Sequence, residues 1–227
     1  MGAPGVVALV PARDEEDRVG DTVRALAGID RVGEVVVVDD GSADATAVEA
    51  LGAGATVLRI PGHAGKGAAL EGALRRLPAA DVWLFADADL GASAAGLDIV
   101  LAAVLDGSAD LAVAVFPPLA GGGFGMVQRA ATRAIRALSD IGAEEPLSGQ
   151  RAISAACLAA CRPLAAGFGV ETAMTIDAAR AGYRFVEIPV TALTHRPTGR
   201  ALSGFAHRGR QGIDIARAVA ARTLRRR

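Results

Sequence analysis

Short, uninterrupted apolar segments alternate with longer alanine-rich segments along the first half of the chain. Five segments have the composition of buried strands, and they span 5–10, 34–39, 55–60, 81–86 and 109–116. The segments between them have the composition of helices, and they span 16–27, 43–51, 66–77 and 93–105. Parallel strands buried on both faces read as continuous apolar runs and are joined by helical crossovers. The alternation therefore predicts an α/β fold with a mostly parallel sheet and helices on both faces.

The pattern changes after residue 116. A loop rich in proline and glycine over 117–125 precedes predicted helices at 126–138 and 171–181 and predicted strands at 148–151 and 184–190. A basic helix over about 202–222 follows, and no internal repeat or linker interrupts the chain. We therefore expect one domain over residues 1–200 and a basic C-terminal helix within residues 201–227.

Composition narrows the class of protein. The chain has 227 residues, 52% of them hydrophobic, and a net charge of −1, which excludes a disordered chain. No apolar run approaches the roughly 18 residues of a membrane span, and the N-terminus lacks the basic region of a signal peptide. Cys157 and Cys161 are four residues apart, which suits neither a zinc site nor a CxxC redox motif. We expect a cytoplasmic protein with two reduced core thiols and no nucleic-acid partner.

The charge is unevenly distributed along the chain. Residues 195–227 contain nine arginines and one acidic residue, Asp214, a balance of +8, so residues 1–194 carry −9. This pattern predicts a basic C-terminal helix on an acidic domain. The exposed face of such a helix is solvated, or it contacts an anionic substrate or the inner membrane surface. The remaining alternative is packing of this helix on the domain or on a second subunit in a homodimer.

Acidic clusters follow two of the predicted strands, Asp39-Asp40-Gly41-Ser42 and Asp87-Ala88-Asp89. Ligands of open parallel sheets bind beyond the carboxyl ends of the strands, so we expect these two clusters to lie side by side at the site. Two carboxylates at positions i and i+2 repel each other, and a Mg²⁺ or Mn²⁺ ion that bridges them to substrate phosphates relieves this repulsion. As an alternative, Asp89 caps the next helix.

One basic residue differs from all the others. Of 24 basic residues 23 are arginine, and the single lysine, Lys66, opens a predicted helix between two glycines. Its ammonium group and the free amides of a helix N-terminus together suit a diphosphate. The first strand is followed by P-A-R-D-E-E instead of G-x-G-x-x-G, and G-H-A-G-K-G lacks the spacing of a P-loop. Both common nucleotide-binding folds are therefore excluded.

These segments resemble those of the family 2 glycosyltransferases. The similar motifs, in the family's order along residues 5–197, are P-A-R-D-E-E, V-V-V-V-D-D-G-S-A-D-A-T, G-K-G, A-D-A-D-L, P-L-S-G-Q-R-A, G-F-G-V-E-T and V-E-I-P-V. The resemblance implies the glycosyltransferase-A fold and transfer of a sugar from a nucleotide-diphosphate donor. It also implies a nucleotide-sugar half over residues 1–116 and an acceptor half over residues 117–200.

The resemblance further implies roles for single residues. Asp89 and His195 would bind the metal. The candidate catalytic residues are Asp89 and Glu171. Glu171 opens a predicted helix, where it would orient or deprotonate an acceptor hydroxyl or, as the alternative, only stabilise the helix N-terminus by its charge. The expected donor-binding residues are Pro11, Ala12, Arg13, Glu15, Asp39, Asp40, Gly41, Ser42, Lys66, Asp87 and Ala88. The expected acceptor-binding residues are Gly122, Gly123, Ser148, Gly149, Arg151 and Arg196.

Two branches of the family share these motifs. Similarity to glucosyl-phosphoglycerate synthases implies transfer of glucose or mannose from a UDP-linked donor to a phosphorylated acceptor such as phosphoglycerate. Similarity to polyprenyl-phosphate sugar transferases implies a lipid-phosphate acceptor at the membrane surface. Phe124 and Gly125 depart from the acceptor-phosphate loop of the first branch. Two further alternatives are a sugar-phosphate nucleotidyltransferase, whose glycine-rich loop is missing after the first strand, and a non-catalytic nucleotide-binding module.

Overall fold

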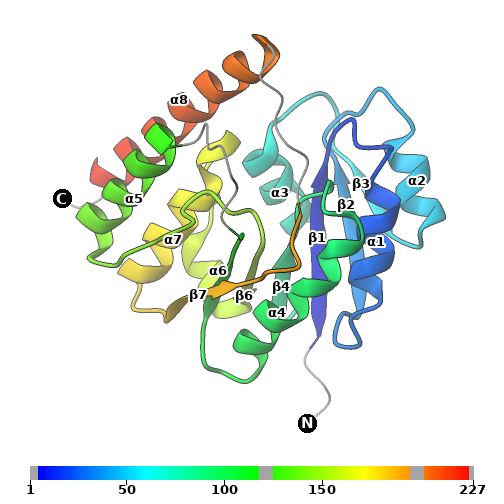
Figure 1. The fold of residues 1–227 in the computed structure, drawn as a ribbon, viewed down its shortest axis with the longest axis horizontal. Coiled ribbons are helices and arrows are strands. Elements are labelled where there is room, and N and C mark those ends of the chain that lie inside the picture. Colours follow the sequence, from blue (N-terminus) through cyan, green and yellow to red (C-terminus); the bar gives the residue numbers. More distant parts are fainter. Residues whose placement is uncertain (1–4, 118–124, 195–201, 225–227) are drawn as a thin grey trace.

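A seven-stranded sheet forms the centre of the computed structural model, which describes residues 5–117, 125–194 and 202–224 (Figure 1). The strands are β1 (Val6–Ala12), β2 (Glu34–Asp39), β3 (Thr56–Arg59), β4 (Val82–Phe85), β5 (Leu111–Val115), β6 (Arg151–Ser154) and β7 (Phe185–Pro189). Their order in the sheet is β3-β2-β1-β4-β6-β5-β7. Strand β6 runs antiparallel to both of its neighbours, and the other neighbouring pairs are parallel. The predicted α/β fold is confirmed.

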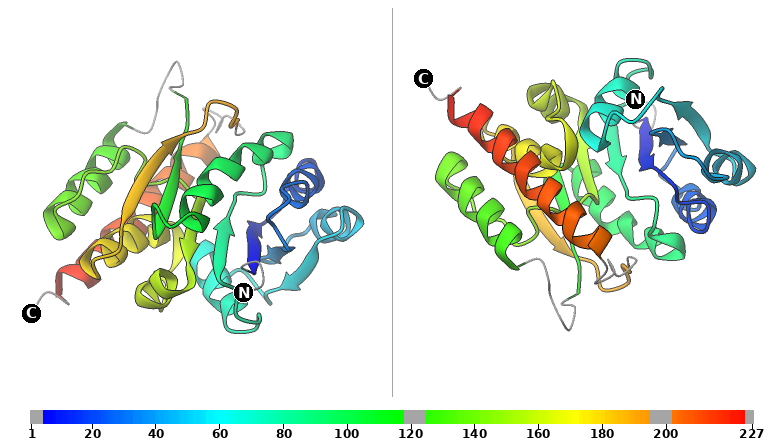
Figure 2. Two further views of the ribbon diagram at one scale, coloured as in Figure 1. Left: turned by 90° about the horizontal axis from the view of Figure 1, so that it is seen from below. Right: turned by 90° about the horizontal axis from the view of Figure 1, so that it is seen from above.

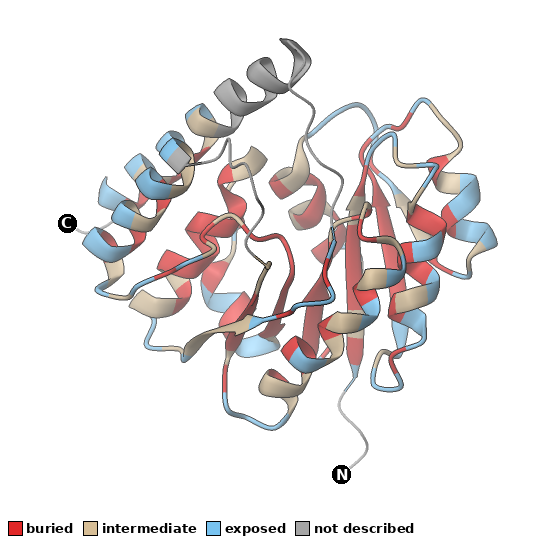
Figure 3. Ribbon diagram, viewed as in Figure 1, coloured by how far each residue is buried: buried red, intermediate tan, exposed pale blue. Residues whose placement is uncertain are grey.

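Helices cover both faces of the sheet (Figures 1 and 2). One face packs against α1 (Val19–Ala27), α2 (Thr46–Gly52), the 3-10 helix η1 (Gly91–Leu97) and α4 (Asp98–Leu105). The other face packs against α3 (Lys66–Leu74), α6 (Ala155–Cys161) and α7 (Val170–Arg180). Figure 3 shows the central strands as a buried layer between them, whereas the edge strands β3 and β7 are only partly buried. Burial on both faces explains why the strands read as unbroken apolar runs.

Strand β1 lies between β2 and β4, with Ala12 opposite Asp39 and Leu9 opposite Phe85. The prediction that the two acidic clusters lie directly side by side is therefore wrong. The chain winds outward from β1 through β2 to β3, and helix α3 then returns it to the opposite side of β1. The carboxyl ends of β1, β2 and β4 still lie at one edge of the sheet, which is the edge where ligands of such sheets bind.

Some element boundaries differ from the prediction. The strand expected at 148–151 begins only at Arg151, because Ser148 and Gly149 cross the sheet edge beside Asp87. The helix expected at 16–27 begins at Val19, since residues 14–16 hydrogen-bond with the loop after β2. The helix expected at 93–105 divides into η1 and α4.

An additional helical layer covers α7. It consists of α5 (Gly125–Ser139) and α8 (Leu202–Leu224), which lie beside each other (Figure 2). Ile135 and Leu138 of α5 form a small core with Ile176 of α7, and Val219 of α8 packs against it. Of the alternatives for the basic C-terminal helix, packing on the domain is therefore the one that the described residues support.

Arg222 is a buried part of this layer. Its guanidinium forms an ion pair with Asp177 of α7, and its carbonyl oxygen accepts a hydrogen bond of 2.8 Å from Arg180. Arg222 therefore does not contribute to a solvated or lipid-facing surface of the basic helix, because its charge is satisfied inside the helix interface. Arg217, by contrast, is exposed.

Both cysteines lie in the described part of the chain. Cys157 and Cys161 are both buried and free, as predicted. Of the helices in the described part of the chain, none combines the length and the apolar character that a membrane crossing requires.

Replacing Arg222 with methionine is expected to lower the free energy of unfolding by up to about 3 kcal/mol, because the mostly buried carboxylate of Asp177 is left without its partner. The matched control is Arg217→Met on the exposed side of the same helix, which should change stability by about 0.5 kcal/mol or less. Urea unfolding measures both. Equal effects of the two substitutions would contradict the assignment of Arg222 to the helix interface.

Candidate donor-sugar site

The loops after β1 and β2 are fastened to each other. The amide of Asp14 donates a hydrogen bond of 3.0 Å to Oγ of Ser42, and the amide of Glu15 donates one of 2.8 Å to Oγ1 of Thr46. The carboxylate of Asp14 accepts one of 2.8 Å from the amide of Ala43. The predicted donor-binding residues of the two loops are therefore brought together at the carboxyl edge of the sheet.

Asp39 and Asp40 are buried and engaged with the protein. Asp39 accepts hydrogen bonds from the amide of Ser42 at 2.8 Å and from Nε of Arg59 at 2.9 Å. Asp40 accepts them from Nδ1 of His63 and from the amides of residues 64 and 65, at 2.7 to 2.9 Å. Asp40 thus holds the loop that leads into α3. Direct contact of either carboxylate with a nucleoside stays a prediction.

Gly41 allows these two loops to approach closely. Its φ is +80°, and a Cβ atom at this position would overlap the carbonyl oxygen of Gly62. Only glycine adopts this conformation without strain, so residue 41 fixes the path of the chain between β2 and the loop before α3.

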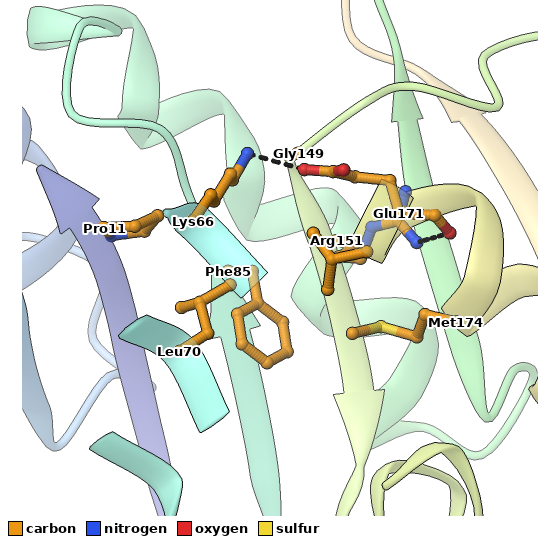
Figure 4. Close-up of a pocket in the computed structure, with 9 residues that line it drawn as sticks. Pro11, Lys66, Leu70, Phe85, Gly149, Arg151, Glu171 and Met174 are labelled. Carbon is orange, nitrogen blue, oxygen red and sulfur yellow. Dashed lines mark hydrogen bonds and ion pairs between the residues drawn. The ribbon is translucent and has the colours of Figure 1, made fainter. Parts of the chain in front are cut away.

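Lys66 lies between two carboxylates at the N-terminus of α3. Its Nζ is 2.6 Å from Oδ1 of Asp87 and 2.7 Å from Oε1 of Glu171, and Figure 4 shows it extending toward Glu171. Burial favours the uncharged amine, but the charges of Asp87 and Glu171 outweigh it and raise the pKa of Lys66 above its usual value. Burial likewise favours a neutral Asp87, yet Lys66 lowers the pKa of that carboxyl.

The predicted acceptor segment reaches the same cluster. Nε2 of Gln150 donates a hydrogen bond of 2.7 Å to Asp87, and Oγ of Ser148 donates one of 3.1 Å to Gln150. A Cβ atom at Gly149 would lie 2.6 Å from both Nζ of Lys66 and Oδ1 of Asp87. A side chain at residue 149 would therefore displace the Lys66–Asp87 contact, and the predicted donor and acceptor segments meet at Lys66.

Arg151 is buried next to Lys66 and Glu171 and stabilises the backbone around them. It is 1% exposed, and its guanidinium donates to the carbonyl oxygens of Ser148 and Glu171 (Figure 4). Burial lowers the pKa of this guanidinium, although nearby carboxylates oppose the effect. The expected role of Arg151 as a clamp for acceptor phosphate does not match this position, because its donors already bind two backbone carbonyls that fix the acceptor segment and α7.

Asp89 stands at the end of the A-D-A-D turn. The turn is fixed from α1, since Arg18 donates to the carbonyl oxygen of Asp89 at 3.1 Å and Thr22 donates to that of Ala88 at 2.7 Å. Both carboxylate oxygens of Asp87 are hydrogen-bonded to the protein, and the side chains of Asp87 and Asp89 are both partly exposed. Within the described ranges no group of three or more metal-ligating side chains occurs.

A Mg²⁺ ion shared with substrate phosphates requires only one or two protein carboxylates, so Asp89 fits such an ion without a larger cluster. The expected second ligand, His195, lies outside the described residues, as do Gly122, Gly123 and Arg196. Pro11 and Ala12 form the end of β1, and the exposed Arg13 forms an ion pair with Asp14 at 3.5 Å.

A narrow pocket opens beneath Lys66 between the end of the sheet and α7 (Figure 4). Its wall is mostly apolar, and the charged groups of Lys66, Arg151 and Glu171 lie at its margin. The lining residues are Pro11, Lys66, Leu70, Phe85, Gly149, Arg151, Val170, Glu171 and Met174. The pocket therefore joins the ends of β1 and β4 to the acceptor segment and to α7.

The sequence and the fold match known proteins. Residues 7–152 match the model of the family described as Glycosyl transferase family 2. The chain belongs to this family. A curated relative is the glucosyl-3-phosphoglycerate synthase of Mycolicibacterium paratuberculosis (strain ATCC BAA-968 / K-10), 32% identical in an alignment of 197 positions that covers 74% of this chain. The chain spans 58% of the length of that relative.

Solved structures of family 2 proteins resemble the whole described fold. Glucosyl-3-phosphoglycerate synthase from Mycobacterium tuberculosis in complex with Mg²⁺ and UDP is 26% identical, with a TM-score of 0.81 over 96% of this chain and 79% of that chain. The same enzyme with Mn²⁺, UDP and phosphoglyceric acid gives 26% identity and a TM-score of 0.81 over 96% and 78%. The family resemblance seen in the motifs is confirmed.

Three residues of this family 2 site were not predicted from the sequence. Gln150 binds Asp87, Thr22 fixes the A-D-A-D turn, and Asp214 of α8 accepts a hydrogen bond from the amide of Phe168. Two of these residues, Gln150 and Asp214, could have been recognised in the sequence. Gln150 lies inside the P-L-S-G-Q-R motif, and Asp214 is the single acid among nine arginines in residues 195–227.

Glu145 and Glu187 lie close together beside the predicted acceptor segment, and we expect this contact to make stability depend on pH. Glu187 binds the amides of Glu144 and Glu145 at 2.7 to 2.9 Å, and burial together with the charge of Glu187 raises the pKa of Glu145. A raised pKa stabilises the fold while the group is protonated, and this contribution is lost as pH rises through the folded-state value. As the pH rises above about 4, the Glu145→Gln variant should therefore lose less stability than the unaltered protein.

The control for this effect is Glu144→Gln at the exposed neighbouring position. Urea unfolding at several pH values measures all three proteins. If the pH dependence of Glu145→Gln equals that of the unaltered protein, the carboxyl group of Glu145 is not perturbed in the fold.

Proposed function

We propose that this protein transfers a hexose, with glucose as the first candidate, from a UDP-linked donor to phosphoglycerate or a similar phosphorylated acceptor. The single observation that carries the proposal is the placement of Lys66 between Asp87 and Glu171, where the donor and acceptor segments meet. The relatives named above as glucosyl-3-phosphoglycerate synthases support the choice of donor and acceptor.

The donor side is built from the fastened loops after β1 and β2 and from the N-terminus of α3. In the proposed complex, the diphosphate lies at Lys66 and at the free amides that begin α3. A compact ammonium group on a flexible stem reaches such a diphosphate from between Gly65 and Gly149. Asp39 and Asp40 hold the loops that frame the nucleoside, and Gly41 fixes the path between them.

A divalent cation completes the donor site in this proposal, with Asp89 and His195 as its protein ligands. Bound there, Mg²⁺ or Mn²⁺ would neutralise charge on the diphosphate and make it a better leaving group. The structure contributes the fixed A-D-A-D turn, because Arg18 and Thr22 hold its backbone and leave the carboxylate of Asp89 partly exposed.

Glu171 serves the acceptor in this proposal. Its carboxylate is 2.7 Å from Lys66, and the neighbouring Gly149 belongs to the predicted acceptor segment. When Lys66 binds the donor diphosphate, one partner of Glu171 is withdrawn, and the carboxylate becomes available to accept a hydrogen bond from the acceptor hydroxyl. Arg151 holds the backbone of Glu171 throughout.

The test is a transfer assay with Mn²⁺ or Mg²⁺ in which donor and acceptor are varied separately. The donors are UDP-glucose, UDP-galactose, GDP-glucose and GDP-mannose, and the acceptors are 3-phosphoglycerate, glycerol 3-phosphate and a polyprenyl phosphate in vesicles. Mass spectrometry identifies the glycosylated product, and nucleotide release gives its rate. We expect a hexosyl-phosphoglycerate from UDP-glucose.

Each other outcome decides against part of the proposal. Transfer only to the polyprenyl phosphate would replace the soluble acceptor by a lipid. Formation of a nucleotide-sugar from sugar phosphate and nucleoside triphosphate would identify a nucleotidyltransferase. Release of no nucleotide diphosphate from any donor, by protein that binds UDP and metal, would leave a binding module and overturn the proposed transfer.

A further inference from the structure

A short segment of backbone lies between α3 and α8. On one side, a Cβ atom at Gly67 of α3 would overlap the carbonyl oxygen of Ala165. On the other side, a Cβ atom at Gly169 would lie 2.6 Å from Cβ of Ala218 and 2.7 Å from the carbonyl oxygen of Asp214, both in α8. Residues 165–169, which include the 3-10 helix η2 (Gly167–Gly169), are therefore in direct backbone contact with two helices.

Asp214 fixes this segment by a specific contact. Its Oδ2 accepts a hydrogen bond of 3.2 Å from the amide of Phe168. Gly167 has a φ of +64°, and a Cβ atom there would overlap the carboxylate of Asp214. The carboxylate also lies at the beginning of α7, where a negative charge is favourable to the helix dipole.

The fixed segment leads directly into the site. Helix α7 begins at Val170, and its second residue is Glu171, three positions after Phe168. On the opposite side of the segment, Lys66 is the first residue of α3. The distance of 2.7 Å between Lys66 and Glu171 therefore depends on where residues 165–169 hold the two helix N-termini.

We propose that Asp214 is a positioning residue of the transferase, and that α8 is thereby part of the active-site architecture. The inference rests on the proposed function, in which Lys66 binds the donor and Glu171 the acceptor. Asp214 acts through the backbone of Phe168 and touches neither ligand. Its hydrogen bond sets the position of Glu171 relative to Lys66.

A second contact between α7 and α8 provides the matched control. The ion pair of Arg222 with Asp177 joins these helices farther along α7, and it involves no residue of 165–171. Loss of this ion pair weakens the docking of α8 but leaves the hydrogen bond to Phe168 in place. A role of Asp214 in positioning is thereby separable from a role in holding α8 on the domain.

The experiment compares Asp214→Ala, Asp214→Asn and Arg222→Met at a temperature at which all three remain folded. Transfer kinetics and hydrogen exchange of residues 165–171, followed by mass spectrometry, are measured on the full chain. For Asp214→Ala we expect kcat to fall about 10- to 100-fold with the KM of the donor within about 2-fold, and exchange of this segment to become faster.

Asparagine keeps a side-chain oxygen that accepts the hydrogen bond, so Asp214→Asn should retain near-normal kcat and exchange. Arg222→Met should lower the melting temperature while kcat stays within about 2-fold of the original value. Normal kcat and exchange in Asp214→Ala would overturn the proposal, as would an equal loss of kcat in Asp214→Asn or in Arg222→Met.

Failure of the proposed function would be recognised separately. If the unaltered protein transfers no sugar, the proposed reaction is wrong. The exchange comparison still decides whether Asp214 fixes residues 165–171, because it requires no substrate. Unchanged exchange in Asp214→Ala would then refute the anchor itself.

Discussion

Replacing Lys66 with methionine is expected to lower kcat/KM for sugar transfer by about 100- to 1000-fold, which corresponds to about 3–4 kcal/mol of lost transition-state stabilisation. Methionine keeps most of the length of the side chain but removes the charge that lies between Asp87 and Glu171. The proposed diphosphate then loses the positive charge that Lys66 contributes beside the metal ion. Steady-state kinetics over a range of donor concentrations measures the effect.

The companion variants separate charge from shape. Lys66→Arg keeps the charge, but its wider head meets Gly149, where even a Cβ atom would lie 2.6 Å from Nζ, so we expect at least about a 10-fold loss. Arg75→Met, at the end of the same helix, removes an exposed cation and should leave kcat/KM unchanged. Full activity of Lys66→Met would refute the place of this lysine in the donor site.

Exchanging Glu171 for glutamine should lower kcat by about 100-fold, because the amide cannot accept a proton from the acceptor hydroxyl. The dissociation constant of UDP should stay unchanged or fall, since Lys66 loses a carboxylate that competes with the diphosphate. Glutamine retains the shape of the side chain and Arg151 still binds the backbone of residue 171, so the fold should persist. Single-turnover kinetics and UDP titration measure the two quantities.

Glu49→Gln on the exposed face of α2 is the control for this change, and we expect it to behave like the unaltered protein. The split between kcat and donor affinity identifies the role of Glu171. A weaker affinity for UDP at unchanged kcat would place Glu171 on the donor side and contradict its assignment to the acceptor.

The arrangement of strands shows how far the sequence predicts this fold. Apolar runs such as 34–39 and 81–86 identified the central strands, because burial on both faces leaves no room for polar side chains. The position of β1 between β2 and β4 was not predicted, since the order of strands depends on the direction in which each helix returns the chain.

The site was predicted unevenly. Lys66 was correctly singled out, because a lone lysine between glycines is visible in the sequence. The inward position of Arg151 was not, since its burial depends on carbonyl oxygens of Ser148 and Glu171 that only the tertiary structure supplies. Asp214 stands out in the sequence as an isolated acid among arginines, but nothing in the sequence identifies its distant partner, Phe168.

The positive charge of the C-terminal helix is only partly exposed to solvent in the structure. Arg222 is buried against Asp177, so not all of the basic C-terminal charge faces solvent. The inner face of α8 meets the segment before Glu171, which connects the basic helix to the site by packing instead of by charge.

The most direct test of the account is the binding of UDP to the unaltered protein and to Asp89→Ala, measured by calorimetry with Mn²⁺ and with EDTA. We expect Mn²⁺ to strengthen UDP binding by at least about 10-fold in the unaltered protein and Asp89→Ala to abolish this gain. Equal affinity for UDP in Mn²⁺ and in EDTA, or an undiminished gain in Asp89→Ala, would contradict a metal-dependent donor site at this edge of the sheet.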